Sequence, residues 1–456
     1  MSDITSKETP PSHAERDIIP IGIKLSWSAG AAGVAFMMNA LAFFALFYMV
    51  GVLKIEPAIA GIVIFLPKIF DAVTDPIVGT WSDRIKTGKS RRRPFLFIGA
   101  VMSSLSFLMV FTTPVFDNEW FTVAYIFIGL LIFALGYTIF NIPYLSMPAE
   151  MTSDYHERSS IHGYRVIFIS VGGLLAGSGI PLLLEHMGHS SWTAYAVMGV
   201  IGAGVIMISM LLAWYGTAKA KFTTGQVERP PLFTELSHVF SNKHFIRLLS
   251  VKFCQLLGVA ATIAAFAFFV VNVMQRSFNV LALYGVVVAL FGIISAPLMV
   301  RLSRKIGKSQ TYIVSALFYV AAVASWALVE PNEPTQWILL RGVLLGIAST
   351  GNVIMAMSML TDIINYDAKI TGVRREGIFT SFYTFVEKFT FAFGPLLVGI
   401  ALSVAGFNEA LPLEEMQTPQ IRHALLMGMS YIPAVMGVLS IILLLGYKLR
   451  ESDLLD

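Results

Sequence analysis

Two carboxylates and a lysine lie on one face of a long apolar segment near residues 57–82. Lys68, Asp71 and Asp75 are three and four residues apart, so on a helix their side chains point the same way. In a bilayer each such charge costs about 2.5–3.5 kcal/mol on insertion scales, so two carboxylates without a role are rare there. The spacing predicts an ion site inside a membrane. The competing interpretation is a local ion pair between Lys68 and Asp71.

The composition predicts the helices that must carry this site. Of 456 residues, 56% are hydrophobic and 13% are charged, whereas soluble domains have about 25% charged residues. Apolar runs of about 20 residues can cross a bilayer, and they predict an all-α membrane protein with twelve transmembrane helices. These segments lie near 25–52, 57–82, 95–114, 120–147, 161–184, 192–215, 246–274, 280–300, 310–329, 335–360, 377–404 and 423–447.

Basic residues predict the orientation. Three of them fall in the expected outer loops, Lys54, Arg276 and Arg422, whereas basic runs crowd the opposite side. Both termini are therefore expected in the cytoplasm, with the protein in the plasma membrane, for a bacterium the inner membrane. The expected divisions are a tail at 1–24, a six-helix half at 25–215, a polar cytoplasmic linker at 216–245, a second six-helix half at 246–447 and a tail at 448–456.

Several motifs resemble a known transporter family. Gly79-x-x-x-Asp83-Arg84, with the basic run after it, resembles the loop motif of the major facilitator superfamily. Asp71-Ala-Val-Thr-Asp75-Pro76 is similar to the second helix of the glycoside–pentoside–hexuronide:cation symporters. Further similar stretches are 136–144, Glu157-Arg158 with Arg165, 361–367 and Lys388. The resemblance spans the chain and implies the major facilitator fold and cation-coupled import of a sugar by alternating access.

The resemblance also implies roles for individual residues. The positions that match its cation site are Asp71, Thr74, Asp75 and Thr138. The positions that match its sugar site are Tyr137, Asn141, Arg165 and Lys388. The chain departs from the family pattern at three points, because Ala35 and Asn141 stand where melibiose-transporting members have aspartates and Thr74 stands where they have asparagine. These departures leave the sugar and the ion open.

The residue types themselves give expectations about the ion and the sugar. Carboxylate and hydroxyl oxygens suit Na⁺, and a carboxylate with a raised pKa suits H⁺. Asn39 and Tyr383 offer further hydrogen-bonding and aromatic groups for a sugar.

An anionic sugar would gain from a lysine or arginine that faces it, whereas a neutral glycoside would leave these charges to Asp71 and Asp75. One alternative is that the carboxylates of the second helix pair with Arg165, which would leave Lys388 as the free charge. Glu387 points about 100° away from Lys388 on a helix, so we expect it to have another partner.

A second charged group lies at the expected cytoplasmic ends of the helices. Arg158, Asp362 and Asp367 come from opposite halves of the chain. Ion pairs between them would close the inner side of a transporter. The alternative is a solvated charged loop without a gating role.

Other functional classes have weaker support in the sequence. A membrane enzyme would need a histidine-rich helix, paired catalytic acids or a phosphate-binding loop, and these patterns are not found. The same fold with a lipid, drug or other non-sugar cargo remains as the alternative. We expect no cofactor beyond the coupling ion, a sugar and the lipid bilayer as partners, no nucleic acid, and a monomer.

Overall fold

The computed structural model describes residues 19–84, 92–152, 155–220, 239, 241–372, 376–408, 411, 416–447 and 449. Every regular element assigned to these residues is a helix. Most of both expected tails and of the expected linker lies outside the described residues. The surroundings of Gly79 and the side chains of Asp83, Arg84 and Arg158, which were predicted to act in the motif loop and the inner gate, also lie outside the described part of the structure.

The helices before residue 220 form one group. They are α1 (Ile21–Phe47) with the π-helical turn η1 (Tyr48–Val52), α2 (Pro57–Arg84), α3 (Arg93–Phe111), α4 (Glu119–Met151), α5 (Tyr155–Leu174) with the π-helical turn η3 (Leu175–Gly179), α6 (Ile180–Met187), α7 (Trp192–Gly216) and the 3-10 turn η4 (Thr217–Lys219). Within this group α1 packs on α5 and α7, and α4 packs on α2 and α3.

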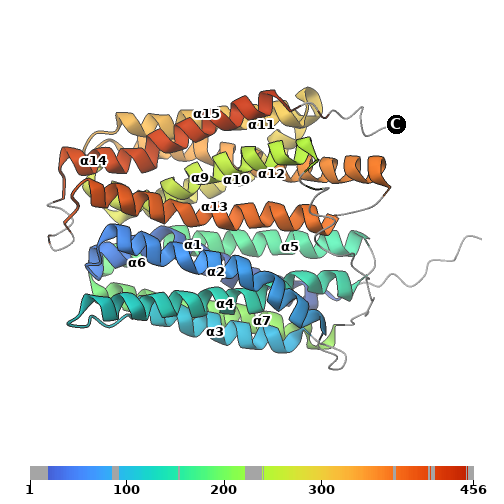
Figure 1. The fold of residues 1–456 in the computed structure, drawn as a ribbon, viewed down its shortest axis with the longest axis horizontal. Helices are drawn as coiled ribbons and strands as arrows, with labels where there is room; N and C mark the ends of the chain where they lie inside the picture. The colour runs from blue at the N-terminus through green and yellow to red at the C-terminus, as the bar shows by residue number, and fades with distance from the viewer. Residues whose placement is uncertain are drawn as a thin grey trace, which may run out of the picture.

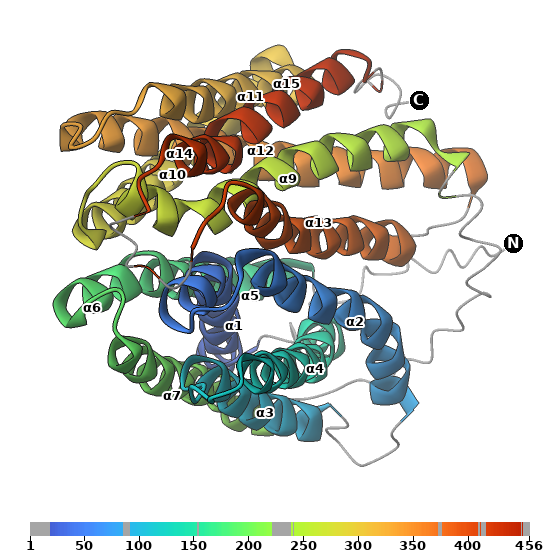
Figure 2. The same cartoon turned by 60° about the vertical axis from the view of Figure 1, so that its left-hand side comes forward.

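The helices after residue 240 form a second group beside the first (Figure 1). They are α9 (Lys243–Asn272), α10 (Phe278–Ile306), α11 (Lys308–Ala324) with the 3-10 turn η5 (Ser325–Leu328), α12 (Thr335–Thr371), α13 (Glu376–Val404), α14 (Pro419–Leu426), the π-helical turn η7 (Met427–Tyr431) and α15 (Ile432–Leu445). Figure 2 shows α13 next to α2 at the boundary between the groups, and these two helices are in contact.

Eleven spans among the described residues are long and apolar enough to cross a membrane, and they coincide with eleven of the expected segments. The remaining expected segment is α2, a helix of 28 residues that is not among the eleven. The residues at its first turn explain where it begins. Pro57 occupies the first helical position, where no amide donor is required. The Glu56 carboxylate accepts hydrogen bonds from the amides of Ala58 and Ile59, at 3.2 and 2.9 Å.

Glycines set the relative position of α2 and α13. A Cβ added to Gly61 would lie 2.9 Å from the carbonyl oxygen of Pro395, and one added to Gly399 would lie 2.3 Å from that of Pro57. Small residues allow membrane helices to approach this closely. The contacts pair 57 with 399 and 61 with 395, which is an antiparallel register. Continued inward, this register places residue 388 level with residue 68 and close to the carboxylates of α2.

One end of the bundle is closed by aromatic rings from both groups. We call it the outer end, following the orientation expected from the basic residues; it lies at the left of Figure 1. The Phe47 ring lies 4.9 Å from the Phe268 ring and 5.6 Å from the Phe278 ring, measured between centroids, and all three residues are fully buried. The Glu185 carboxylate of α6 accepts a hydrogen bond from the first amide of α10, at 2.8 Å. The two groups are thus tied together at this end.

Candidate functional site

The α2 carboxylates meet a lysine from the other group of helices. The Lys388 ammonium of α13 contacts Asp75 Oδ2 and lies 3.3 Å from Asp71 Oδ2. The Asp71 contact lacks hydrogen-bond geometry and is therefore ionic only. The Asp71 side chain is 2% exposed, whereas Asp75 is 26% exposed. The pair thus joins α2 to α13 and remains accessible on the Asp75 side.

A hydroxyl from α4 completes this group. Thr138 Oγ1 lies 2.5 Å from Asp71 Oδ1 and 2.9 Å from Asp75 Oδ1. A hydroxyl has one proton and can donate it to one oxygen at a time. Three oxygens therefore converge with a single hydroxyl proton between them. Oxygen atoms are the ligands that hard cations prefer, and two carboxylates this close can also share a proton.

The other residues near the carboxylates have different partners. Thr74 Oγ1 donates to the carbonyl oxygen of Asp71, at 3.2 Å, so its hydroxyl is used within α2. Lys68 Nζ lies 3.8 Å from the Met38 sulfur. Among the described ion pairs, the carboxylate of Asp71 binds Lys388 and not Lys68, which was the local pairing considered from the sequence. Lys68 still lies within electrostatic range of both carboxylates.

Polar side chains on α4 continue the site beyond Thr138. Lys388 Nζ lies 5.0 Å from the centroid of the Tyr137 ring, a cation–π contact. The Asn141 amide donates to the Tyr137 hydroxyl at 3.0 Å, whereas its own oxygen is buried without a hydrogen-bond partner. Both residues lie one turn apart on the same face of α4. An acceptor oxygen is therefore available next to the cation–π pair.

Arg165 on α5 lies next to tyrosines of α4 and shares a side-chain hydrogen bond with Tyr144. Its guanidinium interacts electrostatically with the tyrosines at 137 and 144, which are two turns apart on α4, and with His162 on α5. Its Nε is buried without a hydrogen-bond partner. The alternative ion pair between Arg165 and an acid of α2 is not among the described contacts; the described partner of both α2 carboxylates is Lys388.

Two further residues predicted to bind the sugar, Asn39 and Tyr383, have described contacts outside the group of Asp71, Asp75, Thr138 and Lys388. The Asn39 amide donates to the Ala35 carbonyl oxygen at 2.7 Å, within α1. Tyr383 is buried in the core of the second group, and Lys252 Nζ lies 5.0 Å from its ring centroid. Their roles toward a sugar stay predictions.

A buried ion pair was not predicted from the sequence. Lys252 on α9 binds Glu387 at 2.9 Å, and the lysine side chain is 5% exposed. The expectation that Glu387 and Lys388 have different partners is confirmed. The adjacent opposite charges on α13 were the only signal, and they did not identify α9 as the partner helix.

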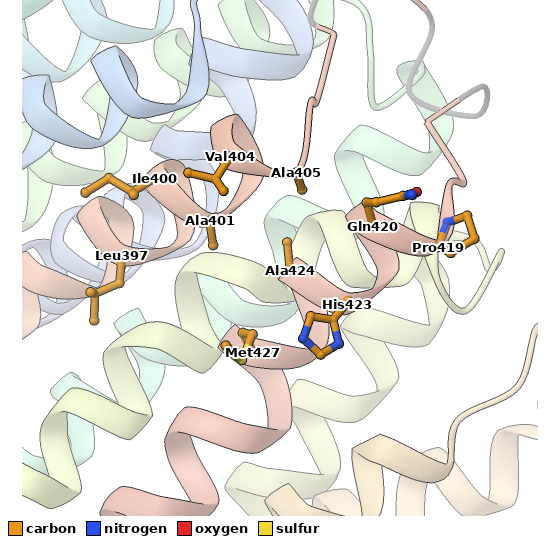
Figure 3. Close-up of a pocket in the computed structure, with 10 residues that line it drawn as sticks. All are labelled: Leu397, Ile400, Ala401, Val404, Ala405, Pro419, Gln420, His423, Ala424 and Met427. Carbon is orange, nitrogen blue, oxygen red and sulfur yellow. The ribbon is translucent and has the colours of Figure 1, made fainter.

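The acids of the predicted inner gate are bound within their own group of helices. Lys308 lies 2.6 Å from Asp362 Oδ2, and the Asn242 amide lies 3.5 Å from Asp367 Oδ1. Because the Arg158 side chain is outside the described residues, its pairing stays a prediction. An apolar pocket of about 570 Å³ lies elsewhere, between α13 and α14 at the outer end (Figure 3). Its lining includes Gln420 and His423 but none of the predicted site residues.

The family model, the sequence relatives and the solved structures that resemble this chain are all transporters. The family model described as MFS/sugar transport protein matches residues 26–451. The uncharacterized symporter YnaJ of Bacillus subtilis is 26% identical over 94% of this chain and 92% of its own. The isoprimeverose transporter of Lactiplantibacillus pentosus is 25% identical over 99% and 94%. A bacterial homologue of the lysosomal transporter Spinster, solved inward-facing and unoccupied, has the same fold, with a TM-score of 0.66 and 15% identity over 94% and 98%.

Proposed function

Because the chain belongs to the MFS/sugar transport protein family, we propose that it imports a sugar together with a cation by alternating access. The family confirms the resemblance to the glycoside–pentoside–hexuronide:cation symporters. A relative that transports isoprimeverose supports a sugar as cargo. The charged, hydroxyl-bearing site favours a polar cargo over a lipid or drug.

The observation that carries this proposal is the ion pair across the two groups of helices. The single ammonium of Lys388 is paired with the carboxylates of both Asp71 and Asp75. A cation bound by these carboxylates and Thr138 competes with the ammonium for the same two carboxylate groups, which Lys388 contacts through their Oδ2 atoms and Thr138 through their Oδ1 atoms. Binding therefore releases Lys388 and loosens the contact between α2 and α13. The released ammonium then becomes available to the sugar.

Coupling follows from this exchange. If the cation frees donors that the sugar needs, the sugar binds more tightly when the cation is present. By linkage, the sugar strengthens cation binding by the same factor. Sodium is our preferred ion, because three oxygens converge at the site, and a proton is the alternative.

The outer aromatic closure supports an inward-facing arrangement. Phe47, Phe268 and Phe278 pack across the two groups at the outer end. We propose that these contacts open in the outward-facing state, while Arg158, Asp362 and Asp367 then meet at the inner end. The motif loop of Gly79, Asp83 and Arg84 would move with the inner end of α2.

The topology completes the proposal. We take α2 as the twelfth membrane helix, because two six-helix halves at 25–215 and 246–447 then flank a cytoplasmic linker at 216–245. The tails at 1–24 and 448–456 would both be cytoplasmic, in a monomer in a bacterial inner membrane.

Transport measurements with purified protein in liposomes test this function. A panel of radiolabelled glycosides, pentosides and uronides is offered with an inward sodium gradient, with an inward proton gradient, or with neither. We expect accumulation of at least one sugar to depend on the sodium gradient at fixed pH. Accumulation driven by the proton gradient alone would reverse the choice of ion. Failure of every sugar under all gradients would refute the proposed function.

A further inference from the structure

An ion pair inside the second group of helices has no part in the cation exchange described above. Lys252 of α9 binds Oε1 of Glu387 on α13 at 2.9 Å. Lys252 Nζ also lies 5.0 Å from the centroid of the Tyr383 ring, and one turn along α9 the Gln255 side chain accepts a hydrogen bond from Tyr312 at 2.6 Å. The lysine, the glutamine and both tyrosines are buried. Glu387 is the member of this cluster that reaches the surface, with 33% of its side chain exposed.

The exposed part of Glu387 belongs to a polar face of α13. The four residues that share this face at helical spacing are Thr380, Thr384, Glu387 and Lys388. Both threonines are exposed. On the opposite face Phe385 and Phe389 stack, with ring centroids 5.7 Å apart. Ionisable side chains within membrane helices face the bundle interior or a water-filled cavity, not lipid. The polar face therefore borders an aqueous path that leads from the inner end of α13 to Lys388.

Glu387 lies beside the coupling site without being part of it. Lys388, the next residue, pairs with Asp71 and Asp75, so Glu387 lies at the same level of the membrane. Consecutive helix residues point about 100° apart, and α13 contacts both α9 and α2. Lys388 and Asp75 are themselves 17% and 26% exposed. A solute that enters along the polar face therefore meets Glu387 next to the coupling site.

The free oxygen of Glu387 is suited to a hydroxyl group. Within the described part of the chain, Lys252 is the one polar contact of the Glu387 side chain, and it uses Oε1. An ionised carboxylate can only accept hydrogen bonds, so Oε2 is available to a donor. Hydrogen bonds to a charged acceptor are stronger than those between neutral groups. Lys252 is buried beneath the carboxylate and fixes its orientation. The arrangement therefore fits a ligand that carries hydroxyl groups.

We propose that Glu387 accepts a hydrogen bond from a hydroxyl of the transported sugar and that Lys252 is the positioning residue that holds this carboxylate. The inference rests on the proposed function and adds a specificity-determining contact from the second group of helices. The predicted sugar residues Tyr137 and Asn141 lie in the first group, on α4. A sugar held by Glu387 as well would contact both groups, which move against each other during alternating access.

Binding of deoxy sugars to the purified full-length protein tests the inference. The parent sugars are methyl β-D-glucoside, methyl β-D-galactoside and methyl β-D-xyloside, each compared with its monodeoxy derivatives. Affinities are measured by calorimetry in lipid nanodiscs at saturating sodium and fixed pH. We expect the wild type to bind at least one parent and to lose about tenfold or more in affinity when the hydroxyl that contacts Glu387 is removed.

Variants assign this loss to one residue. In Glu387→Gln the loss should shrink about threefold or more at that one hydroxyl position, because a neutral acceptor replaces the charged one. The losses at the other positions should stay as in the wild type. The double variant Lys252→Met/Glu387→Met removes both charges together, which avoids an unpaired buried charge, and should abolish the loss at that position. Glu333→Gln is the matched control, because it breaks the buried ion pair with Arg341 at the outer end.

The outcomes separate a sugar contact from a purely structural ion pair. If Glu387→Gln and the double variant weaken the binding of the parent and of all its derivatives by the same factor, the pair only joins α9 to α13 and the inference is overturned. Unchanged affinities in both variants overturn it as well. If Glu387→Gln fails to fold, the double variant decides. If the wild type binds none of the three parents, the inference fails, whereas the proposed function fails only if no sugar of the wider transport panel is accumulated.

Discussion

Replacing Lys388 with glutamine is expected to strengthen cation binding. In the absence of a cation it is expected to lower the free energy of unfolding. The Lys388 ammonium occupies the carboxylates of Asp71 and Asp75, so an incoming cation must first displace it. Glutamine is one bond shorter than lysine, stays polar and carries no charge. The variant therefore removes a competitor that is covalently attached to the protein, while leaving the oxygen ligands in place.

The magnitude follows from the distances and burial. Two unit charges 4 Å apart interact by about 4 kcal/mol at an effective dielectric constant of 20. Solvent reaching Asp75 and hydrogen bonds from the glutamine amide offset part of this, so we expect a net gain of at least about 1.4 kcal/mol, or tenfold in affinity. Without a cation, removal of one partner of a buried pair costs about 3–5 kcal/mol. Cation binding should recover much of that loss.

Thermal unfolding in detergent measures both effects. Sodium is titrated against choline at constant ionic strength, and pH is varied separately at fixed sodium. Without sodium, we expect the Lys388→Gln variant to have a lower melting temperature than the wild type. It should reach half of its sodium-dependent stabilisation at about one-tenth of the sodium concentration that the wild type needs. Lys252→Gln is the control, because this lysine pairs with Glu387 and not with the α2 carboxylates. Equal sodium and proton affinities in Lys388→Gln and wild type would refute the competition.

Three further predictions concern the same cycle. Thr138→Val should lower cation affinity about tenfold or more, because a buried carboxylate loses its hydroxyl donor, whereas Thr74→Val should have a smaller effect; equal losses in the same titration would contradict the structure. Asp75→Asn should abolish cation-driven accumulation in liposomes and preserve sugar exchange, and accumulation at the parental level would exclude Asp75 as the coupling residue. Glu185→Ala removes a hydrogen bond worth about 1 kcal/mol at the outer end. A cysteine engineered into the outer aromatic cluster, in a Cys254→Ala background, should therefore be labelled about fivefold faster. An unchanged labelling rate would show that Glu185 does not hold the outer end closed.

The sequence by itself determined the membrane helices and the shared face of the α2 charges. Long apolar runs can satisfy their backbone groups in lipid only as helices, so composition and length predict them directly. The spacing of Lys68, Asp71 and Asp75 is a local property of one helix and needs no partner to be recognised. The family resemblance added Thr138, whose hydroxyl does lie between the two carboxylates.

Only the tertiary structure decided which charges meet. Arg165 and Lys388 carry the same charge on two membrane helices, so nothing local distinguishes them as partners of α2. The close glycine contacts at Gly61 and Gly399 fix the register of α2 against α13 and bring Lys388 to the carboxylates. Arg165 is left beside neutral rings, and Lys252 finds Glu387 across α9 and α13. Partner choice depends on how closely whole helices can approach, and residue spacing within a single helix does not contain that information.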